Sequence, residues 1–229
     1  MNIISLCEKS STSLIPWAMF GGYHCTCVDL QNDDHIKEFP SGDRINFVRA
    51  DIRYWRPIDS NNIIWAFPPC THLAVSGAKH FKNKGLKCLI DALTLVERCE
   101  KICEENSILY AIENPVGTLS TYWREPDYYF QPNEYAGYLD GDMPIPRDSY
   151  TKKTYLWTSK NFVMPERKPI QAVKGSIVHV KLRDANERAL FPLSFSYALY
   201  LYNKKVCEEQ NLNETHPTGD PDSDSTMQR

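Results

Sequence analysis

The chain has 229 residues, of which 42% are hydrophobic and 24% charged, an ordinary composition for one soluble globular domain. Its net charge is −3, and positions 213–229 account for it with four acidic residues against one arginine. The neutral remainder argues against a large electrostatic footprint on duplex DNA, although it leaves room for a local basic groove. No apolar run approaches the roughly 20 residues of a membrane-spanning helix. The N-terminus has no basic leader, so we expect a cytoplasmic protein.

The first part of the chain alternates strand-like runs with a helix and loops. Residues 2–6, 23–30 and 44–50 read as strands, and residues 14–20 between the first two read as a helix. Asp29 ends the second strand, and Asp51 follows the third. The pattern predicts a mostly parallel, doubly wound α/β sheet.

Two further apolar runs lead into chemically reactive residues. The predicted strand over 62–67 continues into Pro68-Pro69-Cys70, and the one over 107–112 continues into Glu113-Asn114-Pro115. Ligands bind outside the carboxyl ends of parallel strands, so a thiol and a carboxylate are offered at the edge where chemistry takes place. The two prolines stiffen the path of the chain before Cys70.

The second half of the chain is less regular. Apolar residues recur at helical spacing over 88–106, which predicts the longest helix. Residues 116–150 are polar, contain prolines and are rich in aromatic rings, so we expect an ordered loop region over one face of the sheet. Strands are predicted at 151–158 and 177–180, and a final helix at 191–209. We therefore divide the chain into one domain, residues 1–211, and a disordered acidic tail, residues 212–229.

Several common chemistries lack their motifs. There is no Gly-x-Gly-x-x-Gly pattern, which disfavours NAD and FAD, and no Walker-type phosphate loop. There is no Cys-x-x-Cys, and Leu73 stands where a zinc deaminase would need a second cysteine, so we expect no metal. The eight cysteines are spread through strand-like and helix-like segments, which favours reduced thiols over disulfides. Asp29 and Asp51 could each hold the ribose of a nucleotide-like cofactor or merely cap the next helix.

The Pro-Cys and Glu-Asn pairs, in this order and after these strands, resemble two catalytic motifs of the cytosine-C5 methyltransferase family. More closely, the chain is similar to small phage and prophage members of that family over roughly residues 2–207. The matching segments are Leu6-Cys7-Glu8-x-Ser10, Cys27-Val28-Asp29-Leu30, Phe67 to Gly77, Ile112 to Pro115, Lys153 to Trp157, and Glu187-Arg188. The resemblance implies a Rossmann-like class I fold that uses S-adenosylmethionine, in a bacterial or phage-infected cell.

The resemblance also implies roles for individual residues. Cys70 would add to carbon 6 of cytosine, and Glu113 would bond N3 and the exocyclic amine, so that carbon 5 can accept a methyl group. An inert buried thiol is the alternative interpretation of Cys70. The residues expected to contact the cofactor are Cys7, Glu8, Asp29, Leu30, Asp51, Ile52 and Pro68. Those expected to contact the substrate are Thr71, His72, Ser76, Asn114 and Lys153.

The chain departs from the family in three places. Lys9-Ser10-Ser11-Thr12 replaces the usual glycine-rich first turn, and residues 159–176 are too short for a domain that reads duplex DNA. Lys152-Lys153 stand where a Gln-x-Arg-x-Arg element is expected.

The leading hypothesis is methylation of cytosine in DNA with loose specificity. Methylation of a free cytosine nucleotide (dCMP or dCTP) is an alternative within the same class, and a catalytically inactive, cofactor- or nucleic-acid-binding regulator or decoy is an alternative of another class. The aromatic residues of 122–138 either stack nucleobases or form a hydrophobic lid.

Overall fold

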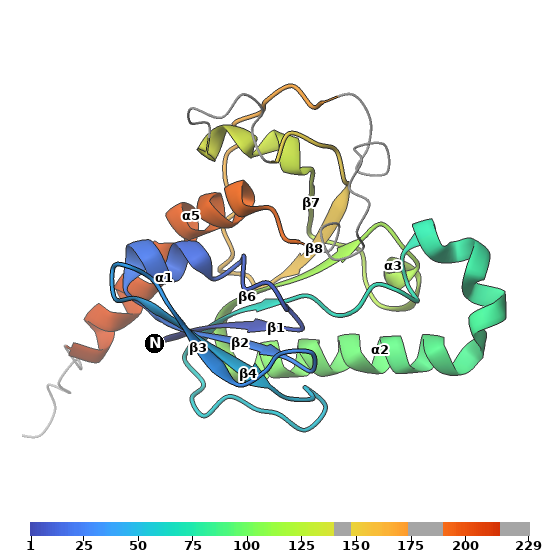
Figure 1. Ribbon diagram of the computed structural model, residues 1–229, viewed down its shortest axis with the longest axis horizontal. Coiled ribbons are helices and arrows are strands. Elements are labelled where there is room, and N and C mark those ends of the chain that lie inside the picture. Colours follow the sequence, from blue (N-terminus) through green and yellow to red (C-terminus); the bar gives the residue numbers. More distant parts are fainter. Residues whose placement is uncertain (140–147, 174–189, 216–229) are drawn as a thin grey trace, which may run out of the picture.

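The computed structural model describes residues 1–139, 148–173 and 190–215, which form an eight-stranded mixed sheet with helices packed on it (Figure 1). The strand order is β3-β4-β2-β1-β5-β6-β8-β7. The five central strands run parallel: β4 (Arg44–Arg49), β2 (His24–Asp29), β1 (Asn2–Leu6), β5 (Asn62–Ala66) and β6 (Ser107–Pro115). Three antiparallel pairings lie at the two ends, made by β3 (His35–Glu38), β8 (Thr154–Thr158) and β7 (Tyr128–Phe130). The predicted α/β sheet is confirmed, and its parallel part is confined to the centre.

Helices cover both faces of the sheet (Figure 1). On one face, Trp17 of α1 (Ile15–Gly21) and Phe195 of α5 (Leu193–Thr215) are fully buried in one core cluster with Ile3 and Ile63. On the other face, Val96 and Cys99 of α2 (Phe81–Asn106) are buried against strand residues such as Ile64 and Ile112. The apolar strand residues thus alternate between two cores, which is the reason for the near-continuous apolar runs in the sequence.

The helix α2 begins earlier than predicted and contains a break. It follows a short helical segment, η1 (Val75–His80), and is interrupted at Gly85, whose φ of 77° and ψ of 172° are not helical. The chain therefore changes direction near the N-terminal end of α2 (Figure 1). The predicted start at residue 88 falls near the beginning of the uninterrupted part, where the helical spacing of apolar residues begins.

The aromatic-rich region of 116–150 contains regular structure where we predicted only a loop. Its described residues include α3 (Leu119–Tyr122), β7, η2 (Pro132–Glu134) and η3 (Ala136–Leu139). Phe130 of β7 stacks on Phe195 of α5 with ring centres 3.9 Å apart, and Tyr135 lies 4.5 Å from the same ring. These rings are core residues of the α5 face, so for them the hydrophobic interpretation holds.

The C-terminal predictions are only partly covered. The helix α5 continues to Thr215, beyond the predicted helix end at 209 and the predicted domain boundary at 211. The predicted strand at 177–180, the Glu187-Arg188 pair and residues 216–229 of the predicted tail lie outside the described residues. Among the helices that are described, none combines the length and the apolar character needed to cross a membrane.

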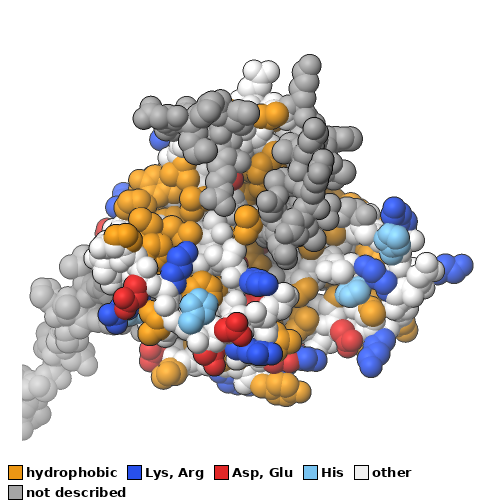
Figure 2. All heavy atoms as spheres, in the orientation of Figure 1, with side chains coloured by type: hydrophobic (Ala, Val, Ile, Leu, Met, Phe, Trp, Pro, Cys, Tyr) orange, Lys and Arg blue, Asp and Glu red, His pale blue; other side chains and the backbone are white. Residues whose placement is uncertain are grey.

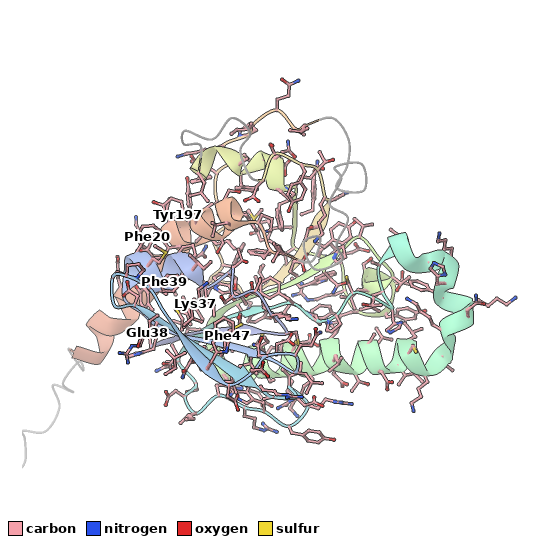
Figure 3. All side chains as sticks on the ribbon, viewed as in Figure 1. Phe20, Lys37, Glu38, Phe39, Phe47 and Tyr197 are labelled. Carbon is pink, nitrogen blue, oxygen red and sulfur yellow. The ribbon has the colours of Figure 1, made fainter. Side chains whose placement is uncertain are left out.

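The strand β3 was not predicted, because its four residues are all exposed and show no apolar alternation. It pairs with β4 at the open end of the sheet, where the His35 and Phe47 rings stack 4.3 Å apart. Lys37 Nζ lies 5.2 Å from the Phe39 ring centre. Figure 3 shows Lys37, Phe39 and Phe47 below Phe20 of α1 and Tyr197 of α5.

Candidate active site

The turn that carries Cys70 begins where β5 leaves the sheet. The Phe67 N–H still donates to Leu6 O at 2.9 Å, but Pro68 and Pro69 have no N–H and cannot continue the ladder. The Cys70 carbonyl then accepts hydrogen bonds from the N–H groups of Leu73 and Ala74, both at 2.9 Å. The half-buried Cys70 is therefore held at the start of a tight helical turn.

The sequence places Glu113 after the strand, but in the structure Glu113 lies inside β6. Ile112 pairs with Ala66, the last residue of β5, so Glu113 is placed directly beyond the end of that strand. The strand β6 continues to Pro115 because β8 pairs with it on the other side, with Glu113 opposite Leu156. Cys70 thus follows the end of β5, as predicted, whereas Glu113 lies on the neighbouring strand β6, one residue beyond the level at which β5 ends.

The charges of this edge act on one another. Burial raises the pKa of the Cys70 thiol, and the carboxylate of Glu113 raises it further, while Lys152 lowers it. Burial also raises the pKa of Glu113, with Lys152 opposing and Glu8 reinforcing the effect. The Glu113 carboxyl is desolvated, so its neutral form is favoured more than in water. Cys70, Glu113 and Lys152 therefore form one electrostatic cluster.

Asn114 connects the two motifs from inside the protein. It is fully buried, and its Nδ2 donates to the carbonyl oxygen of Pro68 at 2.9 Å. Its Oδ1 accepts no hydrogen bond from the described residues. The side chain predicted to contact substrate therefore ties β6 to the Cys70 turn, and the predicted cofactor residue Pro68 contributes the carbonyl that it binds.

A glycine allows a second close approach between the motifs. Thr118 N–H donates to Leu73 O at 2.9 Å, and Gly117 forms an isolated bridge with Ala74. A Cβ on Gly117 would lie 2.3 Å from the Leu73 carbonyl oxygen, closer than any real contact. Gly117 was not singled out from the sequence, although its position three residues after Asn114 was visible there.

The two neighbouring lysines have different surroundings. Lys152 acts on both Cys70 and Glu113, whereas Lys153, the residue predicted to contact substrate, lies over two rings. Its Nζ is 4.6 Å from the Tyr129 ring centre and 5.5 Å from that of Tyr155. Lys152 and Lys153 directly precede β8, and neighbouring residues of an extended chain point to opposite faces. This alternation was the sequence signal that could have predicted their different surroundings.

The first turn is built without glycine and has an unusual backbone. Cys7 and Ser11 both have positive φ, 57° and 56°, in a region that residues with a Cβ rarely adopt. The buried Glu8 carboxylate accepts hydrogen bonds from the Ser13 N–H, the Ser13 hydroxyl and the Ser10 hydroxyl. The Cys99 thiol and burial raise the pKa of Cys7. From α5, Ser196 donates its hydroxyl to the carbonyls of this turn, at 3.0 Å from Thr12 O and 2.9 Å from Ser13 O.

The remaining predicted cofactor residues follow β2 and β4. Asp29 accepts the Gln31 N–H at 2.7 Å, and Leu30 beside it is 56% exposed. Asp51 forms a bidentate pair with Arg53, which holds the pKa of that carboxyl below its usual range. Ile52 is 3% exposed and packs in the core of the α2 face. The predicted alternative, that each aspartate caps the next helix, is wrong, because the next described element after each of them is a strand; both aspartates instead accept the N–H of the residue two positions later in a turn.

These residues fit a nucleoside-bearing cofactor in part. Asp29 uses one oxygen for Gln31, and its second oxygen accepts no hydrogen bond from the described residues, as a ribose ligand requires. Ser11, in the first turn, has a covered hydroxyl without a partner among those residues. Glu8 fits less well, because its carboxylate already accepts hydrogen bonds from three groups. The Ile52 side chain is enclosed in the core, which leaves its backbone for any contact.

The other predicted substrate residues surround Cys70 in sequence. Thr71 is exposed, and its carbonyl accepts a hydrogen bond from Lys84 Nζ at 2.7 Å. His72 is half-buried, and its Nδ1 is covered without a partner among the described residues. The Ser76 side chain lies outside the description. No group of three or more His, Cys, Asp or Glu side chains suited to a metal ion occurs in the described part of the chain.

Comparison with protein-family models gives no match, and comparison with curated proteins gives none either. Among solved structures, the chain is similar to the 16S rRNA methylase RmtB, with 12% sequence identity over 68% of this chain and a TM-score of 0.28. The match covers 54% of that protein, so this chain corresponds to about half of its length. A TM-score this low supports no conclusion about function.

Proposed function

We propose that this chain is an S-adenosylmethionine-dependent methyltransferase that methylates carbon 5 of cytosine in DNA with loose sequence specificity. The observation that carries the proposal is the pairing of Cys70 with Glu113 at the ends of neighbouring strands. Each is affected by the same cation, Lys152, and the Glu113 charge acts directly on the Cys70 thiol.

The chemistry accounts for both residue types. Carbon 5 of cytosine becomes nucleophilic only when a nucleophile adds to carbon 6, and the Cys70 thiolate would form that C–S bond. The electron pair of the ring double bond then moves onto carbon 5, which would take the methyl group from the donor's sulfonium, while the electron pair of the broken S–CH3 bond stays on sulfur as a neutral thioether. Loss of the carbon 5 proton to a base re-forms the double bond and expels the thiolate.

The raised pKa of Glu113 suits its proposed role. A neutral carboxylic acid can donate a hydrogen bond to N3 of the ring as negative charge develops there during addition. Lys152 would favour the thiolate form of Cys70, since it lowers the pKa of that thiol against burial and Glu113. Because burial and Glu113 raise the pKa of Cys70, addition to carbon 6 requires that the thiol first give its proton to a base, and Lys152 would stabilise the thiolate that remains.

S-adenosylmethionine, when bound, would supply the methyl group. Asp29 would hold its ribose through the carboxylate oxygen that Gln31 leaves open, at the carboxyl end of β2. The first turn after β1 would accommodate the methionine end, close to Glu113, on which Glu8 acts electrostatically.

A nucleic acid substrate is favoured by the charge of one segment. Residues 71–90 contain four lysines, two histidines and no acidic residue, although the chain apart from its tail is neutral. This segment runs from the Cys70 turn through η1 into α2, and Lys and His side chains gather over that end of the molecule in Figure 2. Such a cluster could bind phosphates next to the nucleophile.

Trapping with a mechanism-based substrate tests the proposal. A DNA oligonucleotide with 5-fluorocytosine is incubated with the chain and S-adenosylmethionine. Carbon 5 then carries fluorine in place of the proton that a base must remove, so the covalent adduct persists. We expect a protein–DNA species that survives denaturation and maps to Cys70 by mass spectrometry. Cys70→Ser should give none, and the matched variant Cys25→Ser, at a cysteine of β2 that does not line the neighbouring pocket, should react like wild type.

The same assay separates the alternatives. Cofactor binding without any adduct would contradict catalysis on DNA, and the absence of methyl transfer to a free nucleotide as well would favour the regulator or decoy. The shortness of residues 159–176 favours the second candidate, a free cytosine nucleotide. With tritiated methyl donor, label in dCMP or dCTP but not in DNA would establish that candidate, whereas label in DNA alone would exclude it.

A further inference from the structure

A pocket of about 260 Å³ lies beside the Cys70 turn, at the corner where η1 meets α2. Apolar side chains form part of its wall, and its polar side chains are those of one histidine and two lysines. The lining residues used below are His72, Phe81, Lys82, Lys84, Leu86 and Leu89. No acidic residue lines it.

The break in α2 shapes this pocket. At Gly85 the backbone leaves the helix with a φ of 77°, which separates Phe81 on one side from Leu86 and Leu89 on the other. Leu86 is 70% exposed although it lines the pocket, so an apolar surface faces solvent here. A pocket below the roughly 300–1,000 Å³ of sites that enclose drug-sized ligands is suited to a single planar group.

His72 gives the pocket an unused hydrogen-bonding group. Its Nδ1 is covered and has no partner among the described residues, which is rare for buried polar atoms in native proteins. A ligand that pairs with it would therefore satisfy a group that the protein leaves without a partner.

The pocket is tied directly to the nucleophile. His72 lies within the turn that the Cys70 carbonyl closes by accepting from Leu73 and Ala74. Lys84 Nζ donates to the Thr71 carbonyl at 2.7 Å, which connects the first turn of α2 to the residue after Cys70. A ligand in the pocket would thus lie next to a target base at Cys70.

We propose that this pocket binds a second nucleotide unit of the substrate strand, adjacent to the target cytosine. The base would lie against Phe81, Leu86 and Leu89 and bond to His72, while Lys82 and Lys84 would hold its phosphate. A base has the flat apolar face and the hydrogen-bonding edge that this wall requires, and stacking on such surfaces tolerates any sequence. The assignment of the target as cytosine rests on the proposed function, but binding of the strand does not.

Direct binding tests the pocket without catalysis. The probe is a fluorescein-labelled dT tetramer, which contains no cytosine, and the readout is fluorescence anisotropy with the full chain. Leu86→Trp would fill the pocket from an exposed position, and Ile90→Trp is the matched control, since Ile90 is also exposed on α2 but does not line the pocket. We expect Leu86→Trp to weaken binding about tenfold, with Ile90→Trp unchanged, and far-UV circular dichroism to show that both variants are folded.

The phosphate contact has its own signature. Lys82→Gln should reduce the slope of log Kd against log salt by about one, as for loss of one phosphate contact. Lys87 belongs to the same basic segment but lies outside the pocket, so Lys87→Gln should leave binding of the tetramer in the pocket unchanged. Equal affinities for Leu86→Trp and Ile90→Trp would overturn the proposal. Competition by free dTMP as effective as by unlabelled tetramer would also overturn it, because the ligand would then be a free nucleotide.

The outcome is separable from that of the proposed function. If Leu86→Trp loses tetramer binding while 5-fluorocytosine DNA traps nothing at Cys70, methyl transfer to DNA is refuted and the pocket stands. If trapping succeeds while the tetramer binds both tryptophan variants alike, the pocket is refuted and methyl transfer stands.

Discussion

Ser11 stands in the first turn with a left-handed backbone and a covered hydroxyl that has no partner among the described residues. Both features cost stability, because a Cβ is crowded in that region and a buried hydroxyl loses its water. Ser11→Gly should therefore raise the free energy of unfolding by about 1 kcal/mol, measured by urea titration. Ser11→Ala removes the hydroxyl but keeps the strained backbone, so its gain should be smaller. Equal gains for the two would contradict the strain at Ser11.

Glu113 gives the folded protein a defined response to pH. Burial raises its pKa in the folded state above the ordinary value of 4.5, so the native protein binds this proton more tightly than the unfolded chain. The resulting stability is present at low pH and is lost as the pH rises through the folded pKa. Glu113→Gln, neutral at every pH, should be more stable than wild type at pH 8, with the difference shrinking toward pH 4.5.

Urea unfolding at several pH values measures this difference. Glu97→Gln is the control, since Glu97 is exposed on α2 and should show no such trend. A difference for Glu113→Gln that grows toward low pH would refute the sign. In the methyltransferase assay, Glu113→Gln should lower kcat by a factor of about 10²–10⁴, the usual contribution of a general acid.

Among individual residues, the sequence predicted Cys70 and Glu113 better than it predicted the residues around them. Cys70 and Glu113 could be found because each comes within three residues after a buried apolar run that is easy to recognise, although the strand that contains Glu113 ends later than predicted. The sequence predicted Lys153 and not Lys152 as a substrate contact, and it predicted that Asn114 contacts substrate. Both assignments depend on the direction of a side chain, which is determined by strand pairing. Ile52 was assigned to the cofactor, although its packing into the core is decided by contacts with distant α2.

Gly117 controls how closely β6 and the Cys70 turn approach each other. Gly117→Ala would place a Cβ against the backbone of Leu73, which cannot rotate away as a side chain could. We expect a loss of about 1–3 kcal/mol of stability, typical of overpacking, and lower kcat because the Cys70 turn must shift. The control is Gly77→Ala, whose Cβ would meet its nearest atom, Thr71 O, at an ordinary 3.6 Å. Wild-type activity for Gly117→Ala would show that the turn position does not matter.

The elements themselves were predictable where they are buried. The strands β1, β2, β4, β5 and β6 all have apolar residues at their centres, and each was placed within a few positions. The strand β3 has no buried residue and was missed. The extension of β6 past Ile112 could not be foreseen, because it depends on the antiparallel partner β8 and not on the residues of β6.

Phe195 joins distant parts of the molecule in one aromatic core. It is fully buried, stacks on Phe130 of β7 and lies beside Tyr135 and Phe191. Phe195→Ala should cost about 3–5 kcal/mol in the free energy of unfolding, measured with urea. Phe20→Ala, at a ring that is 59% exposed, should cost far less. Similar losses at both positions would contradict the packing of α5 as described.

The whole fold was predictable in class and less so in its outer parts. Alternating apolar strands and helices led to the two-faced sheet, and the described helices do cover both faces. The antiparallel ends and the regular structure of the aromatic region arise from long-range pairing, such as β7 on β8 and Phe130 on Phe195. The attachment of α5 to the first turn through Ser196 joins residues 184 positions apart, which no local pattern records.

The open edge at β3 bears on whether copies of this protein can add to one another's sheets. Phe39 N–H donates to Asp43 O, so by the alternation of an antiparallel ladder the outward backbone groups belong to Ile36 and Glu38. Two copies joined there in antiparallel fashion must match these outward groups. The available two-fold registers place Lys37 opposite Lys37, Glu38 opposite Glu38, or Asp34 opposite Glu38. Each sets like charges face to face, so the edge itself discourages growth of one sheet from another.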